Sequence, residues 1–254
     1  MRRHRAVGWI PIRMGRLRTI LRCRGAGARW KALPVRHGYT NSTERVAGGV
    51  RKSYVGPDAL ARAHAELTAL TRLAHLMPVP AVVERHADGS IVTEFRPGEH
   101  GQDLIEEGRA HEVLASCGAL LRRLHALDPG EVVPGPHPPT HVVLHGDFGP
   151  NNILFDSEDY TVTALLDWEF CTVGPAIGDI AWCEWIVRMN HPADKQSLTA
   201  FFDAYGERPS WEARRLAMID RCRRFEAFGH RWDAHGDLEL QWRRRINETA
   251  AWTE

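Results

Sequence analysis

Three side chains between residues 145 and 167 have the types and the spacing that phosphoryl transfer requires. Asp147 and Asn152 lie five positions apart in the polar stretch His145–Asp156, and Asp167 follows at the end of an apolar run. One carboxylate can accept the proton of an attacking hydroxyl, while an amide oxygen and a second carboxylate hold magnesium between the phosphates. We therefore predict that Asp147 is the general base and that Asn152 and Asp167 are magnesium ligands.

The same three residues also have a simpler interpretation. Asp and Asn in loops commonly form Asx turns and cap neighbouring strands. The spacing HxDxxxxN is only suggestive by itself, and the additional Asp167 after an apolar strand is what favours catalysis.

A lysine and a glutamate nearer the N-terminus provide a grip for nucleotide phosphates. Strand alternation places Val50, Lys52 and Tyr54 on one face, and Glu66 follows within a helical pattern. A strand lysine paired with a helix glutamate is the arrangement that positions the α- and β-phosphates of a nucleotide. The chain has 30 Arg but only three Lys, which favours a function for Lys52. The alternative is that both residues simply face solvent.

The elements that must position these residues differ between the two halves of the chain. Residues 30–55 alternate loosely and predict short antiparallel strands. A helix is expected from Ala59 to about Leu76, followed by a hairpin of Val82–Val83 and Ile91–Phe95. The first half therefore predicts a small sheet with one helix.

The second half is predominantly helical. Its apolar periodicity predicts helices over 104–127, 178–188, 194–205 and from 210 to the C-terminus with a break at 230–236, and short strands over 141–144 and 162–166. We predict an α+β fold with a nucleotide-binding lobe over residues 32–95 and a helical lobe over residues 96–254.

Cysteine and histidine usage exclude several classes of site. The five cysteines are an odd number without a CxxC pair, so neither a disulfide framework nor a zinc site is expected. The fourteen histidines never cluster as a ligand set. No apolar run approaches the length of a membrane span. We expect a soluble, cytoplasmic protein without a membrane partner.

The N-terminal segment 1–31 differs from the rest of the chain in charge. It holds ten of the 33 basic residues and no acidic one, which leaves 23 basic against 32 acidic side chains, a net charge of −9, for the remainder. We predict a basic extension that does not fold, with a nucleic-acid arm, a transit peptide or a leader with a later start at Met14 as open alternatives. The acidic remainder would repel nucleic acid, so no such partner is expected.

The motifs HGDFGPNNILFD, LLDWEF and GDIAW together resemble the aminoglycoside phosphotransferase and choline kinase superfamily. This resemblance covers the chain from about Val35 onward. It implies a two-lobed, protein-kinase-like fold and an ATP- and magnesium-dependent kinase acting on a small-molecule hydroxyl. It agrees with the roles given to Asp147, Asn152, Asp167 and Lys52. It also implies that His145 supports the catalytic loop and that Asp179 is a buried anchor of the loop backbone.

The resemblance also implies positions for the rest of the nucleotide. The segment Thr93–Gly98 resembles the linker between the lobes, so the Glu94 carbonyl and the Arg96 amide should meet the adenine edge. The turn His37–Thr43 would cover the phosphates through Gly38, Asn41 and Ser42. That turn has one glycine where protein kinases have three. Asp167 is followed by Trp-Glu, and no APE motif follows, which favours small substrates over protein substrates.

Two other functions are alternatives to a kinase. A metal-dependent phosphoesterase would need an upstream D-x-H and a downstream N-H-[DE] ligand set, and the sequence contains neither. The second alternative is a catalytically weak nucleotide-binding scaffold. The presence of all four residues with a proposed chemical role, Lys52, Asp147, Asn152 and Asp167, argues against it. The acceptor is not identified by any motif in the sequence.

Acidic side chains in the C-terminal region suggest a cationic acceptor such as an aminoglycoside. An acidic cleft would concentrate cations beside Asp147. The alternative that these carboxylates only solvate helix faces stays equally open. The side chains concerned are Glu184, Asp203, Glu226, Asp233 and Asp237.

Overall fold

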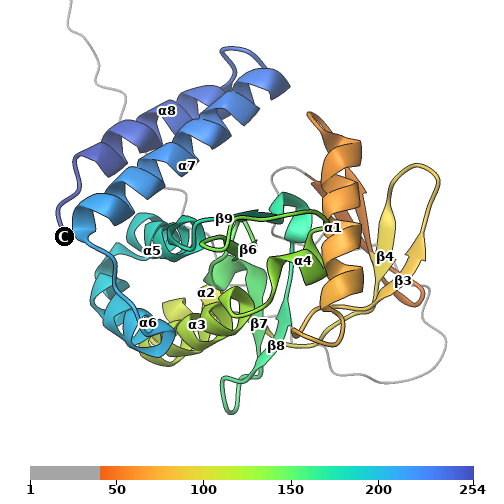
Figure 1. The fold of residues 1–254 in the computed structure, drawn as a ribbon, viewed down its shortest axis with the longest axis horizontal. Helices are drawn as coiled ribbons and strands as arrows, with labels where there is room; N and C mark the ends of the chain where they lie inside the picture. The colour runs from red at the N-terminus through yellow and green to blue at the C-terminus, as the bar shows by residue number, and fades with distance from the viewer. Residues whose placement is uncertain (1–40) are drawn as a thin grey trace, which may run out of the picture. The chain divides into compact units, whose positions relative to one another are not determined.

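A computed structural model of the chain describes residues 41–254 (Figure 1). They form a mixed α+β fold with small antiparallel sheets and a larger helical part, as the sequence predicts. Segment 1–31, the strands expected before Asn41 and Gly38 lie outside the described residues. Within residues 41–254, no helix combines the length and the apolar character needed to cross a bilayer.

A four-stranded antiparallel sheet carries Lys52. Across the sheet its strands are β1 (Asn41–Val46), β2 (Gly49–Tyr54), β4 (Ile91–Thr93) and β3 (Val82–Arg85). Gly48 has a φ of 96° in the β1–β2 turn, a conformation that glycine adopts without steric penalty. Helix α1 (Ala59–Leu73) lies beside this sheet and buries Glu66, Leu70 and Leu73 (Figure 1). The predicted hairpin and helix are therefore present.

The single helix predicted over 104–127 is two helices in the structure. Helix α2 (Gly101–Glu106) ends two residues before Gly108, whose φ is 87°, and α3 (Ala110–His125) begins just after this glycine. The Arg109 amide donates to the Leu104 carbonyl and the Gly108 amide to the Ile105 carbonyl. These two bonds form a Schellman motif, which terminates a helix at a left-handed glycine. The apolar periodicity runs through this break, which is why it predicted one helix.

Two further small sheets surround the stretch His145–Asp156. One contains β5 (Glu99–His100), β7 (Ile153–Phe155) and β8 (Val162–Leu165), and the other pairs β6 (Val142–Leu144) with β9 (Thr172–Gly174). The pairing of β7 with β8 sets Ile153 opposite Leu165. Just beyond this pair, the Leu166 amide donates to the Asn152 carbonyl at 2.8 Å. The backbone register therefore brings Asn152 and Asp167 to the same end of the sheet.

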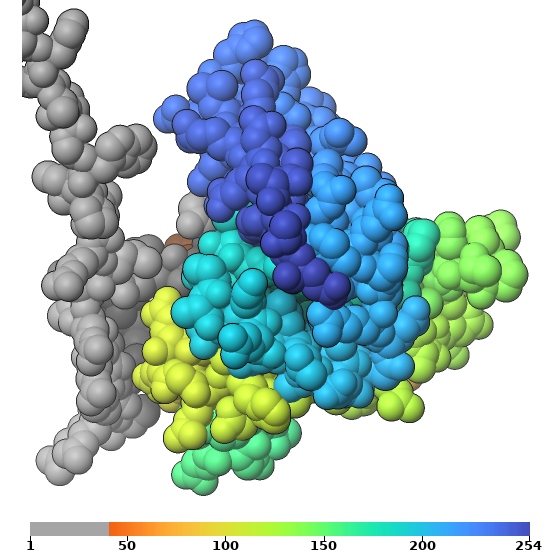
Figure 2. Space-filling view, turned by 90° about the vertical axis from the view of Figure 1, so that its left-hand side faces the viewer, coloured from red at the N-terminus to blue at the C-terminus, as the bar shows by residue number. Residues whose placement is uncertain are grey.

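Helices form the rest of the described chain. They are α4 (Pro129–Val132), α5 (Ile177–Asn190), α6 (Leu198–Tyr205), α7 (Trp211–Trp232) and α8 (Asp237–Ala250), with short 3₁₀ turns at Pro150–Asn152, Trp168–Phe170 and Pro192–Ser197. Helices α7 and α8 lie side by side, and the predicted break separates them (Figures 1 and 2). Between α5, α7 and α8, Trp182 stacks on Trp185 with ring centroids 4.4 Å apart, and Trp242 packs on both.

Candidate active site

The loop that carries Asp147 is held by a buried aspartate on α5. The Asp179 carboxylate accepts the backbone amides of His145 at 2.7 Å and Gly146 at 3.0 Å. Burial acts to raise the pKa of Asp179, but the His125 side chain, with a smaller contribution from the His145 amide, holds it below its usual value. Gly146 has a φ of 84°, and a Cβ there would lie 2.3 Å from the carbonyl oxygen of Phe170. Only glycine fits at this position.

The imidazole of His145 has one defined tautomer. Its Nδ1 accepts the Asp147 amide at 3.2 Å, so its Nε2 carries the hydrogen that is donated to the Leu166 carbonyl at 2.8 Å. Burial lowers the pKa of His145, against the nearby Asp179 carboxylate. The ring is therefore a neutral brace between the loop and the segment that leads to Asp167.

Asp147 has a hydrogen-bond donor on each carboxylate oxygen. Trp182 Nε1 donates to Oδ1 at 2.7 Å, and Asn152 Nδ2 donates to Oδ2 at 2.9 Å. Burial and the Asp167 carboxylate raise the pKa of Asp147 to about 6, despite these two bonds. A carboxylate with this pKa is deprotonated at neutral pH and yet basic enough to take a hydroxyl proton.

Lys52 connects the first sheet to the segment after β8. Its Nζ lies 2.5 Å from Glu66 Oε2 and also bonds Asp167 Oδ1. Tyr54, on the same face of β2, donates to Glu66 at 2.7 Å. Burial acts to lower the pKa of Lys52, but the carboxylates of Asp167 and Glu66 outweigh it and raise the pKa. The predicted lysine–glutamate pair is therefore present, with Asp167 as a third member.

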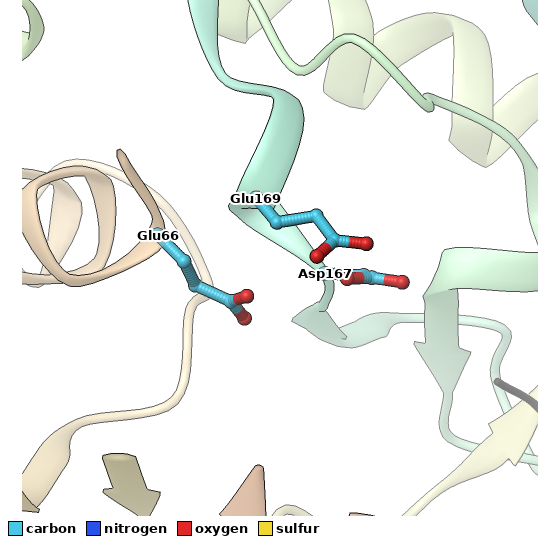
Figure 3. Close-up of side chains that lie close together, drawn as sticks. All are labelled: Glu66, Asp167 and Glu169. Atoms are coloured by element: carbon cyan, nitrogen blue, oxygen red, sulfur yellow. The ribbon is translucent and has the colours of Figure 1, made fainter. Parts of the chain in front are cut away.

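A third carboxylate, which the sequence did not single out, joins this group. One oxygen of each of Glu66, Asp167 and Glu169 lies within 4.8 Å of the others, and Figure 3 shows the three side chains converging. Glu169 accepts Arg62 at 2.6 Å and Asn41 at 2.8 Å. Asp167 has a φ of 66°, which is rare for a residue other than glycine and is found where the surrounding structure holds a side chain in place.

Comparison with known proteins decides the family. Residues 31–141 and 134–217 match the profile of the phosphotransferase enzyme family APH. The chain belongs to this family. Among solved structures, this APH-family chain is similar to the GDP complex of aminoglycoside 2′-phosphotransferase-IIIa, with a TM-score of 0.69 and 14% identity over 88% of this chain and 93% of that one.

Two other solved structures have the same fold. Type VIII aminoglycoside-3′-phosphotransferase gives a TM-score of 0.61 at 21% identity, over 81% of the APH-family chain and 93% of that chain. A choline/ethanolamine kinase family protein from Mesorhizobium loti gives 0.61 at 16% identity, over 89% of each. These likenesses establish the predicted protein-kinase-like fold.

Similar curated proteins are much longer than this chain. Acyl-CoA dehydrogenase family member 11 from Gallus gallus is 33% identical over 85 residues, which are 32% of the APH-family chain. Acyl-CoA dehydrogenase family member 10 from Mus musculus is 25% identical over 158 residues, which are 42% of it. The chain spans only 11% and 15% of the lengths of these relatives.

The residues predicted to contact the nucleotide at the edges of the site are Asn41, Ser42, Glu94 and Arg96. Asn41 and Ser42 were expected in a turn, but they are the first residues of strand β1. Asn41 directs its amide to Glu169, and Ser42 is exposed. Glu94 accepts the Ala81 amide with its carboxylate and forms an ion pair with Arg96. These bonds order the linker, and the contact of its backbone with adenine stays a prediction.

Proposed function

We propose that this APH-family protein transfers the γ-phosphate of ATP, with magnesium, to a hydroxyl of a small molecule. The observation that carries the proposal is Asp147, a carboxylate held by Trp182 and Asn152 with a pKa of about 6. It adjoins Asp167, which Lys52 contacts from the first sheet.

Asp147 would act as general base. It takes the proton as the acceptor oxygen forms a bond to the γ-phosphorus, and the bond from that phosphorus to the bridging oxygen of ADP breaks. The two donors on Asp147 keep its carboxylate oriented, which is the positioning that such a step requires.

The donor atoms present suit magnesium, which prefers oxygen ligands. The side-chain nitrogen of Asn152 donates to Asp147, which leaves the side-chain oxygen Oδ1 free to bind the metal. The Asp167 side chain is 35% exposed and can reach a ligand. Bound magnesium would neutralise charge between the phosphates.

Lys52 would bind the α- and β-phosphates while Glu66 holds its ammonium in place. Gly38, Asn41 and Ser42 would cover the phosphates, and the backbone of Glu94 and Arg96 would bind adenine.

The test is a screen of hydroxyl compounds for stimulated ADP release, with the phosphorylated product identified by mass spectrometry. Asp147→Asn should lower the signal by about 10²- to 10⁴-fold, whereas Asp156→Asn should not, because Asp156 is an exposed acid at the other end of the same motif. Tight ATP binding without transfer to any compound would instead identify a nucleotide-binding scaffold.

A further inference from the structure

Four arginines line a cavity of about 330 Å³. Helix α7 contributes Arg221, Arg224 and Arg231 to its lining, and α1 contributes Arg62. The one acidic residue of the lining is Asp58, although Glu169 and Asp220 also pair with lining arginines from outside the cavity.

Two lining residues of the cavity contact neighbours of Asp147. The Arg221 guanidinium lies 5.8 Å from the centre of the Trp182 ring, and Trp182 is the indole that donates to Asp147. Phe170 lines the cavity with its side chain, and its carbonyl packs against Gly146 of the catalytic loop. Burial lowers the pKa of Arg221 while the Asp147 carboxylate opposes this effect, so the two charges are within electrostatic reach.

Among these arginines, Arg221 differs in having no ion pair with an acid of the described residues. Arg62 pairs with Glu169 at 2.6 Å, Arg224 with Asp220 at 2.8 Å and Arg231 with Asp58 at 2.7 Å. Within residues 41–254, the buried Nε and Nη2 of Arg221 have no hydrogen-bond partner. Aromatic rings contact the guanidinium instead, with centroids 4.6 Å away at Phe225 and 5.6 Å away at Phe170.

Unpaired buried donors are rare because they have given up water without gaining an acceptor. A guanidinium presents its N–H groups in a fork that fits a carboxylate or a phosphate. Arg221 therefore has the properties of an anion-binding group fixed by packing and placed one indole away from the general base.

We propose that the phosphate acceptor is an anionic alcohol, whose carboxylate or phosphate binds Arg221 while its hydroxyl reaches Asp147. This inference rests on the proposed function and names the substrate class of the same site. The acidic side chains that suggested a cationic acceptor do not line this cavity. Two of them are taken up elsewhere: Glu184 pairs with Arg188 and Arg214, and Glu226 pairs with Arg243.

The experiment uses the full chain with ATP, magnesium and four kinds of acceptor. These are hydroxy acids of increasing chain length, the corresponding hydroxy amides, the corresponding amino alcohols, and glycerol 3-phosphate as the phosphate arm. Arg221→Met is compared with Arg221→Lys, which keeps the charge. Arg223→Met is the matched control, because Arg223 is an exposed arginine of the same helix.

We expect an anionic compound to be the preferred acceptor. Arg221→Met should raise its KM about 10- to 100-fold, the range for a lost hydrogen-bonded charge contact, and should leave the KM of the matched amide nearly unchanged. Arg221→Lys should restore part of the affinity, and Arg223→Met should behave as the parent does. The relative preference for hydroxy acid or glycerol 3-phosphate tells the two anion sources apart.

Three results would overturn the inference while leaving the kinase function intact. They are preference for an amide or an amino alcohol, an equal loss for charged and neutral acceptors in Arg221→Met, and no effect of Arg221→Met. If no compound of any charge is phosphorylated, the proposed function fails, and calorimetric binding of the same anions then tests the cavity alone. Binding to the parent that Arg221→Met loses would support an anion site, and absence of binding would reject it.

Discussion

Replacing Asp147 by Asn separates its chemical role from its structural one. The change removes the proposed base but keeps the size of the side chain and one acceptor oxygen. Loss of a positioned general base should lower kcat by about 10²- to 10⁴-fold, which corresponds to about 3–5 kcal/mol of transition-state stabilisation. Trp182 and Asn152 both donate to Asp147, so one donor loses its acceptor, at about 1–3 kcal/mol.

A second effect acts in the opposite direction on stability. Raising the pKa of Asp147 from 3.8 to about 6 means that its ionised form destabilises the fold by about 3 kcal/mol at neutral pH. The Asn variant is free of this penalty. The two contributions are similar in size, so the melting temperature should move by only a few degrees while activity collapses.

The assay is ADP release at saturating ATP, measured across pH. Because Asp147 must be deprotonated to accept a proton, kcat/KM of the parent should fall about tenfold per pH unit below about 6. The residual activity of Asp147→Asn should lack this inflection. Turnover near the parent level in Asp147→Asn, or an inflection that survives the substitution, would refute the assignment.

Three further predictions concern the remaining site residues. Asp167→Ala should abolish the magnesium dependence of ATP turnover, and a magnesium response equal to that of the parent would exclude Asp167 as the ligand. Lys52→Met should raise the KM for ATP, and it should lower the free energy of unfolding by about 3–5 kcal/mol in urea titrations because the Glu66 carboxylate stays buried beside Asp167. Adding Glu66→Gln to this variant should recover stability but not ATP affinity. Recovery of both would contradict the phosphate-binding role of Lys52. Asp179→Ala leaves two loop amides without an acceptor and should lower the melting temperature by several degrees together with kcat, whereas loss of activity at an unchanged melting temperature would show that Asp179 does not anchor the loop.

The sequence predicted the parts of the site that depend on local spacing. Strand alternation put Lys52 and Tyr54 on one face, and both contact Glu66. The apolar run before Asp167 predicted that this residue follows a strand at the site. The pairing of β7 with β8 then places Asp167 near Asn152.

The remaining site residues depend on contacts between distant elements. Trp182 reaches Asp147 from 35 positions away, and Arg62 meets Glu169 across 107 positions. Neither residue belongs to a periodic pattern that differs from ordinary helix packing. Arg221 stands in a helix rich in arginine, and only the packed structure shows that its donors lack acceptors within the described residues.

The fixed tautomer of His145 separates acid inactivation from acid unfolding. Burial keeps the pKa of His145 below 6.5, so as pH falls below 6.5 this ring makes the fold progressively less stable. Asp147, two residues away, has the opposite sign, because protonation between about 6 and 3.8 favours the folded state. The two proton uptakes therefore act on the stability of the fold in opposite directions within one loop. Protonation of Asp147 thus removes the proposed base while it favours the folded state, so turnover should be lost at a higher pH than the fold when both are followed during acid titration.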